Sequence, residues 1–165
     1  MPAALSIRAA LFLIAVGAVS LGAAFASQYF GGLQPCVLCI YQRYPYGVVI
    51  ALGMLVLLAW RQPKLAAGLT LLAAIALFVD AGIAAFHVGV EHHWWEGTSE
   101  CSSLIDPNLS IEDLKNALQE QPVVPCDQVQ WSLFGISMAG YNFLYASVAG
   151  IVATVLAIRL FKSPR

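Results

Sequence analysis

Two cysteines in the stretch Pro35-Cys36-Val37-Leu38-Cys39-Ile40-Tyr41-Gln42-Arg43 have the C-x-x-C spacing of redox-active dithiols. Arg43 follows Cys39 by four residues, so in a helix both side chains would lie on one face. A guanidinium beside a helix N-terminus stabilises a thiolate, which makes the cysteine reactive. The alternative is a pair of small buried hydrophobic residues with an arginine at a helix end. We predict a catalytic dithiol at Cys36 and Cys39.

The other two cysteines, Cys101 and Cys126, lie far apart in a polar segment of the chain. A soluble protein could reach such a segment, so this pair also suits thiol–disulfide exchange. As a purely structural disulfide it would close a loop and contribute about 3 kcal/mol in the chain-entropy treatment. A zinc site of four cysteines suits the pattern less well, because Cys101 and Cys126 lack the close spacing of zinc ligands. We therefore expect two redox-active pairs and no metal.

The composition indicates the environment that must position these residues. Of the 165 residues, 60% are hydrophobic and only 10% are charged, against about 25% charged in soluble domains. Mean hydropathy is +0.78, and a membrane span needs roughly 20 apolar residues. The formal net charge of −1 argues against a nucleic-acid partner. We predict an all-α membrane protein, a four-transmembrane-helix bundle that forms a single integral membrane domain over residues 1–165, with helices at about 9–30, 40–60, 65–90 and 133–161.

The first apolar run, which follows Arg8, has a signal peptide as its alternative interpretation, because Ala24-Phe25-Ala26 resembles a cleavage site. The run exceeds the usual apolar region of a signal peptide, about 7 to 15 residues, which favours a span. Gly31-Gly32 and Pro35 then interrupt the helical pattern. We expect a short loop over about 31–39 that presents the C-x-x-C.

The third apolar run contains Asp80 and His87. An ionisable group within a span is a functional candidate that usually has a partner or faces the bundle interior. For Asp80 we favour a packing or hydrogen-bonding role. His87 lies near the end of the run and suits either an interfacial hydrogen bond or a contact with a cofactor. Asn142, in the fourth run, could form a hydrogen bond between helices.

A polar loop over about 91–132 separates the third and fourth runs. Within it, Ser110-Ile111-Glu112-Asp113 resembles a capping box, and Leu114 and Leu118 continue an apolar stripe. We expect a short interfacial helix there that lies on the bilayer or packs on the loop itself.

Charge is distributed unevenly between the two sides of this four-span topology. Eight of the nine acidic residues lie in the long loop. Six of the eight basic residues fall on the other side, namely Arg8, Arg61, Lys64, Arg159, Lys162 and Arg165. By the positive-inside rule, both termini are cytoplasmic. All four cysteines then face the opposite, oxidising compartment, where disulfides form.

Two dithiols on one side of a membrane suggest an electron relay from a soluble thiol to an acceptor. A strongly oxidising dithiol protein has a potential near −120 mV, whereas a glutathione pool lies at roughly −200 mV and is the wrong acceptor for its electrons. A quinone dissolved in the bilayer is a natural acceptor. The C-x-x-C lies at the depth where a quinone head group would sit.

At this point the residues resemble a known family. The stretch Cys36-Val37-Leu38-Cys39-Ile40-Tyr41-Gln42-Arg43 is similar to the motif of the disulfide bond formation protein B family (DsbB). Cys126-Asp127-Gln128-Val129-Gln130-Trp131 and Leu133-Phe134-Gly135-Ile136-Ser137-Met138 resemble its final loop and fourth-helix entry. The resemblance covers nearly the whole chain. It implies an enzyme of the bacterial inner membrane, a thiol:quinone oxidoreductase that reoxidises a periplasmic DsbA-like protein and reduces a membrane quinone, with the cysteine loops in the periplasm.

The resemblance implies a route for electrons through four catalytic cysteines. Cys101 would form the mixed disulfide with the DsbA-like partner, and Cys126 would resolve it. Cys36 would exchange with Cys126 through an interloop disulfide. Cys39 would be the thiolate that faces ubiquinone or menaquinone, and Arg43 would bind and polarise the quinone oxygen. Cys36–Cys39 and Cys101–Cys126 would be the redox-active disulfides.

The resemblance also places His87 close to the quinone-proximal histidine of some members, so we expect a cofactor contact there. Gln42 replaces an acid found in some members, and His92-His93-Trp94-Trp95 is a pattern of this chain's own. These differences leave the partner preference open.

Other classes of protein fit the pattern less well. A vitamin K epoxide reductase-like enzyme also combines four helices, a C-x-x-C and quinone chemistry, but its loop cysteines precede the C-x-x-C. A membrane electron carrier or haem anchor would use His87, His92 and His93, yet adjacent histidines do not readily pair as axial ligands across a bundle. A non-enzymatic metal-binding protein is the third alternative.

Overall fold

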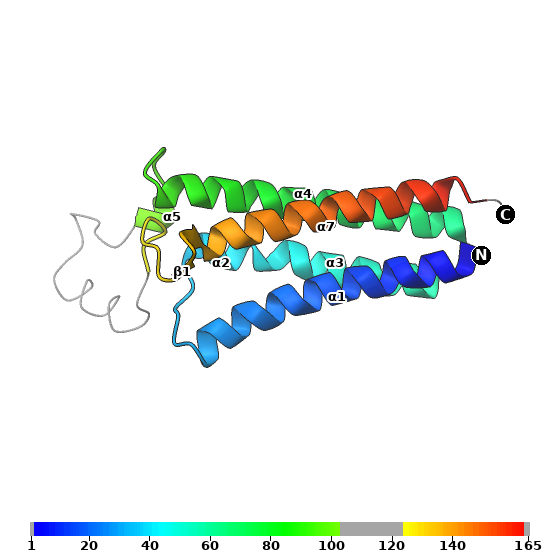
Figure 1. The fold of residues 1–165 in the computed structure, drawn as a ribbon, viewed down its shortest axis with the longest axis horizontal. Coiled ribbons are helices and arrows are strands. Elements are labelled where there is room, and N and C mark those ends of the chain that lie inside the picture. Colours follow the sequence, from blue (N-terminus) through cyan, green and yellow to red (C-terminus); the bar gives the residue numbers. More distant parts are fainter. Residues whose placement is uncertain (1, 103–123, 164–165) are drawn as a thin grey trace.

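The protein is a bundle of four long helices that lie roughly side by side (Figure 1). The computed structural model describes residues 2–102 and 124–163. The long helices are α1 (Pro2–Tyr29), α3 (Arg43–Leu58), α4 (Pro63–Glu91) and α7 (Met138–Phe161), and a short helix, α2 (Val37–Tyr41), directly precedes α3. Four spans are long and apolar enough to cross a membrane, with α2 and α3 together forming the second. The predicted all-α, four-span fold is confirmed.

The outer surface of the bundle is apolar, as expected where lipid is the solvent. Val19, Val79 and Val148, all far from the helix ends, are each more than half exposed. The interior instead holds many small residues, and Ala73 and Ala153 are fully buried. Small side chains allow the extensive contact between α4 and α7, because they let the two backbones approach closely.

The end of α4 is shaped by a backbone motif that leads into the polar loop. His93 has a positive φ of 56°. The His93 N–H donates to the Val90 carbonyl and the Trp94 N–H to the Gly89 carbonyl, which is the Schellman pattern. Trp95 then folds back on α4, where its Nε1 donates to the Phe86 carbonyl at 2.9 Å. The chain therefore turns sharply above the last turn of α4.

A small hairpin precedes α7. Its strands are β1 (Ser132–Leu133) and β2 (Ile136–Ser137), with Ser132 opposite Ser137. Phe134 and Gly135 both have positive φ, as a type I′ turn requires. Because of this hairpin, the fourth helix begins at Met138, where the apolar pattern alone suggested about 133. The Ser137 side chain caps the helix by accepting from the Gly140 N–H at 3.1 Å.

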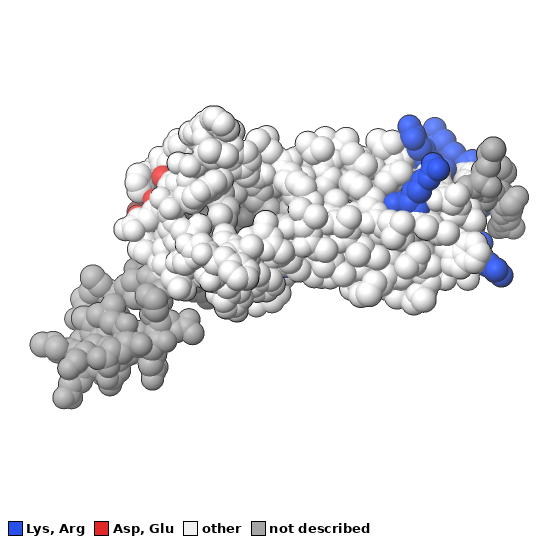
Figure 2. Space-filling view, turned by 60° about the horizontal axis from the view of Figure 1, so that its bottom comes forward, with Lys and Arg blue, Asp and Glu red and all other residues white. Residues whose placement is uncertain are grey.

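Charged side chains gather at the two ends of the bundle. Figure 2 shows basic atoms near the end where both termini lie, and acidic atoms near the opposite end. The cysteines lie at the acidic end, because α2 and α5 (Ser99–Ser102) are both there (Figure 1). The direction in which this bundle crosses the bilayer stays a prediction. The interfacial helix expected near residue 111 lies outside the described residues.

Candidate functional site: two cysteine pairs and a cavity

The first cysteine pair is positioned by the start of α2. Cys36 is the N-cap residue, and its Sγ accepts from the Cys39 N–H at 3.2 Å. The two sulfur atoms lie 2.6 Å apart, and both cysteines are free. The hydrogen bond with Cys39, together with burial, raises the pKa of the Cys36 thiol above its ordinary value. The short distance between the two sulfur atoms places this pair for disulfide formation.

The same sulfur atoms and His87 form a cluster whose ligand atoms all lie within 4.8 Å of one another. Tetrahedral zinc with Zn–S bonds of about 2.3 Å would hold two sulfur ligands about 3.7 Å apart. The observed separation of 2.6 Å is much shorter. The geometry of Cys36 and Cys39 therefore suits sulfur–sulfur chemistry better than joint coordination of a zinc ion.

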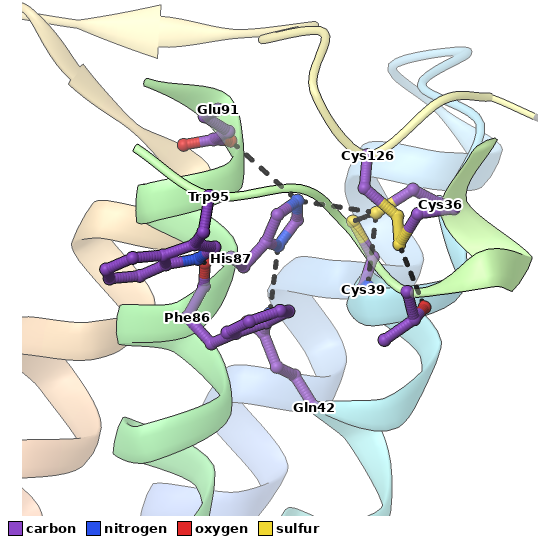
Figure 3. The surroundings of a disulfide bond; sticks show 10 residues. Cys36, Cys39, Gln42, Phe86, His87, Glu91, Trp95 and Cys126 are labelled. Atoms are coloured by element: carbon purple, nitrogen blue, oxygen red, sulfur yellow. Dashed lines mark hydrogen bonds and ion pairs between the residues drawn. A yellow bond between two sulfur atoms is a disulfide. The ribbon is translucent and has the colours of Figure 1, made fainter. Parts of the chain in front are cut away.

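The second pair is a disulfide between Cys101 and Cys126, with a Cα–Cα distance of 5.2 Å. It connects α5 to the segment before the hairpin, and both residues are buried. This disulfide packs in one apolar cluster with Cys36, Leu38 and Val90. Figure 3 shows Cys126 beside Cys36. The fold therefore brings together two cysteine pairs that are far apart in the sequence.

His87 lies beside the first pair (Figure 3). Its Nε2 is 3.5 Å from the Cys36 sulfur and 4.0 Å from Oε1 of Glu91. Its Nδ1 is 3.0 Å from Nε2 of Gln42. Glu91 also accepts a hydrogen bond from Ser137 at the start of α7. His87 thus connects the dithiol to Gln42, directly before α3. Through Glu91 it is also connected to Ser137, at the start of α7.

Behind Gln42, a buried polar network continues into the bundle. Asn142 on α7 donates to both Gln42 and Asp80. The Tyr46 hydroxyl donates to the side-chain Oδ1 of Asn142 at 2.6 Å. The hydrogen-bonding role favoured for Asp80 and the interhelical hydrogen bond expected of Asn142 are both confirmed.

A cavity of about 510 Å³ adjoins this site. Apolar residues of α1, including Val19 and Ala23, line it together with Cys39, Arg43 and His87. Such a cavity, mostly apolar with a few convergent polar groups, is typical of small-molecule sites. It would suit a molecule with a polar ring and a hydrocarbon tail.

Arg43 is held at this cavity by residues of α1. Its Nη1 donates to Gln28 at 2.9 Å, and its guanidinium lies 4.9 Å from the centre of the Phe25 ring. Its Nε is buried and has no hydrogen-bond partner among the described residues. A buried donor without a partner is costly, so this atom suits a carbonyl oxygen of a ligand. The residues present therefore fit a quinone.

The structure gathers Cys36, Cys39, Arg43 and His87 around the cavity and packs Cys101 and Cys126 beside them. Several polar residues of the site were not singled out from the sequence as site residues, among them Tyr46, Glu91 and Ser137. Glu91 follows His87 by four residues, and this helical spacing was the available signal. The sequence gave no such signal for Tyr46 or Ser137, because their hydrogen-bond partners lie on distant segments.

Fold and site together define a multi-span membrane protein with two adjacent cysteine pairs at one end of a four-helix bundle. The family model for disulfide bond formation protein DsbB matches residues 6–156, and the chain belongs to this family. It is a disulfide-forming oxidoreductase of the inner membrane with several spans.

Curated relatives agree with this assignment. The chain is 30% identical to disulfide bond formation protein B of Methylobacillus flagellatus over 151 residues, covering 88% of each chain. It is 28% identical to the Aromatoleum aromaticum protein of the same name over 155 residues, covering 90% of each. It is also 29% identical to an uncharacterised protein of Rickettsia prowazekii over 136 residues, or 81% of this chain and 77% of that one. No solved structure matches the chain.

Proposed function

We propose that this protein oxidises a soluble DsbA-like dithiol protein in the periplasm and passes the two electrons to a quinone in the inner membrane. One observation carries the proposal: the Cys101–Cys126 disulfide packs against Cys36, while Cys39 lines an apolar cavity. The site thus has one sulfur pair in the polar loop and another beside a space suited to a lipid-soluble molecule.

The first half of the reaction is thiol–disulfide exchange. A thiolate of the partner attacks Cys101, the Cys101–Cys126 bond breaks, and Cys126 leaves as a thiolate. The partner's second thiol then attacks the mixed disulfide, so the partner gains a disulfide and Cys101 and Cys126 become thiols. Cys126 next attacks Cys36 of an oxidised Cys36–Cys39 pair, and Cys39 leaves as the thiolate. Cys101 finally attacks Cys126 of the Cys36–Cys126 disulfide. Cys36 leaves as a thiolate, and the Cys101–Cys126 disulfide is restored.

The second half needs an acceptor for the two electrons held by the Cys36–Cys39 dithiol. A quinone bound in the cavity supplies that two-electron acceptor. Cys39 and Arg43 would hold its head group, with the unpaired Nε of Arg43 donating to an oxygen. The apolar wall of α1 would exclude water and bind the hydrocarbon tail. His87 lines the same cavity and would contact the head group.

The proposal also sets the orientation of the bundle. The basic end, with both termini, lies in the cytoplasm, and the acidic end, with the cysteines, lies in the periplasm. Labelling single cysteines in intact cells with an impermeant thiol reagent checks this orientation. Single cysteines introduced at the exposed positions Gln34 and His93, in the two segments that lead to Cys36 and Cys101, should be labelled from the same side.

The decisive experiment mixes the purified protein with reduced DsbA-like protein and ubiquinone-1 or a short-chain menaquinone. We expect one partner disulfide to form for each quinone reduced, followed by thiol labelling and by quinone absorbance. Cys39→Ser should stop quinone reduction. If the partner stays reduced with either quinone present, the proposed function is wrong.

A further inference from the structure

We infer that Asp80, Asn142 and Gln42 are positioning residues that fix the tautomer of His87, so that its Nε2–H points at the Cys36 sulfur. This inference deepens the proposed function and rests on it for the role of Cys36. The residues lie on three different segments: Asp80 and His87 on α4, Asn142 on α7, and Gln42 between α2 and α3. Asp80, Gln42 and His87 are all buried, so the network is shielded from water.

The direction of the hydrogen bonds is set at Asp80. A carboxylate has only acceptor atoms, whereas an amide has one acceptor and one NH₂ group with two donor hydrogens. Asn142 must therefore turn its Nδ2 toward Oδ2 of Asp80, and the distance is 2.9 Å. Its Oδ1 then accepts from the Tyr46 hydroxyl. A flipped Asn142 would place its oxygen against the carboxylate, which is unfavourable.

The orientation of Asn142 decides that of Gln42. The second hydrogen of the Asn142 Nδ2 is donated to the Gln42 Oε1 at 2.7 Å. Gln42 must then present its Nε2, a donor, to Nδ1 of His87 at 3.0 Å. Nδ1 therefore accepts and carries no proton. A neutral imidazole has one N–H, which in this case must be on Nε2.

Nε2 is the ring nitrogen that lies beside the Cys36 sulfur. It lies 3.5 Å from the Cys36 sulfur, with Oε1 of Glu91 at 4.0 Å. An N–H held here stabilises negative charge on Cys36 when that sulfur is attacked or released during exchange. The opposite tautomer would present a lone pair to the sulfur and would lose this interaction.

The test reads the tautomer directly. Protein labelled with ¹⁵N in its histidine rings is reduced with dithiothreitol at pH 8 in nanodiscs, without quinone or partner protein, and the ring nitrogens are observed by NMR. The chain has three histidines, and His87→Ala identifies the signals of interest. In the wild type we expect His87 to carry its proton on Nε2 alone.

Two variants interrupt this series of hydrogen bonds at different points. Gln42→Glu places only acceptors opposite Nδ1, so the proton should move to Nδ1. Asp80→Leu keeps the branched shape of the side chain, at a larger volume, but removes the acceptor that orients Asn142, so both tautomers should appear in comparable amounts. Thr70→Val is the matched control, because Thr70 is also buried on α4 and its hydroxyl donates within that helix, to the Ala66 carbonyl. This control should keep the wild-type tautomer.

A second measurement connects the tautomer to sulfur chemistry. In a Cys39→Ser background, the alkylation of Cys36 should slow by up to about twofold when Asp80→Leu is added, because about half of the population loses the N–H···S bond. Loss of a negative charge alone would speed alkylation, so the sign separates the two causes. An unchanged or faster rate overturns the role at Cys36.

The NMR outcomes are equally decisive. A wild-type ring protonated on Nδ1, or on both nitrogens, overturns the inference, as does a wild-type tautomer in both variants. A change with Gln42→Glu alone removes Asp80 from the assignment, and a change with Asp80→Leu alone removes Gln42. Should Asp80→Leu not fold, Gln42→Glu still decides the tautomer. Because quinone and partner are absent, this result is independent of whether the proposed function holds.

Discussion

The two cysteine pairs of this protein are built in different ways. Cys36 and Cys39 are neighbours on the first turn of α2, and the helix end itself brings their sulfur atoms to 2.6 Å. Cys101 and Cys126 are 25 positions apart and meet only because the chain returns from α5 to the start of the hairpin. The first pair contacts His87 and a cavity. The second pair packs mainly against apolar side chains and accepts one hydrogen bond, from Thr98 to the Cys101 sulfur.

This difference suggests a division of labour. A dithiol beside a helix N-terminus and a histidine has its reactivity tuned by neighbouring groups. A disulfide in a polar loop depends instead on access by a partner protein. We therefore expect changes at the first pair to alter electron transfer to the acceptor, and changes at the second pair to alter exchange with the partner.

The largest expected effect separates the pairs completely. Cys101→Ser should abolish oxidation of the reduced DsbA-like protein, because the attacked sulfur is gone, while Cys36 and Cys39 should still react with quinone. Partner oxidation and quinone absorbance measure the two activities in parallel. Mixed with the oxidised partner, Cys126→Ser should instead accumulate a mixed disulfide on a non-reducing gel, because the free Cys101 thiolate attacks the partner's disulfide, one partner sulfur leaves as a thiolate, and Cys126 is not there to resolve the product. Absence of that conjugate contradicts the order of the relay.

A smaller effect is expected at the cavity. Arg43→Ala should slow quinone reduction about 10- to 100-fold, since a hydrogen bond from a charged donor is lost. Exchange at Cys101 should change far less. Stopped-flow measurement of both half-reactions tests this, and equal slowing of the two would reject the role of Arg43. Arg61→Ala is the control, because Arg61 stacks on Trp60 in the turn before α4.

The pairs should also differ in their effect on stability. Replacing Cys101 and Cys126 together by serine should lower the free energy of unfolding by about 3 kcal/mol, because a long loop is no longer closed. Replacing Cys36 and Cys39 together should cost less, because these two cysteines are free in the structure and would close only a very short loop if they were joined. Denaturant titration of both double variants in mixed micelles gives the comparison. A larger loss for the second variant would contradict the loop-closure explanation.

The smallest effect is expected where the hairpin meets the bundle. Ser137→Ala removes the cap of α7 and the hydrogen bond to Glu91, and should lower stability by about 1 kcal/mol. Exchange at Cys101 should stay within a factor of two or so of the wild-type rate. Ser132→Ala, at the paired and exposed position of β1, should change neither quantity. Equal destabilisation by both variants would show that the hairpin, not the cap, is responsible.

Much of the fold followed from local patterns. Long apolar runs can be satisfied in lipid only by helices, because a helix pairs its own backbone groups. The spans and the C-x-x-C were therefore predictable from composition and spacing. The hairpin before α7 was not, because Phe134 adopts a positive φ that the amino acid itself does not favour.

The amino-acid sequence by itself determined the four-helix bundle, the family and the C-x-x-C, since each depends on residues close together in the chain. Only the tertiary structure decided which distant groups meet. It placed the Cys101–Cys126 disulfide against Cys36 and connected Asp80 to His87 through Asn142 and Gln42. The physical reason is that a hydrogen bond or disulfide between separate segments depends on how the helices pack. The periodic pattern of a helix shows which face is buried, but it does not identify the residue on another helix that this face contacts.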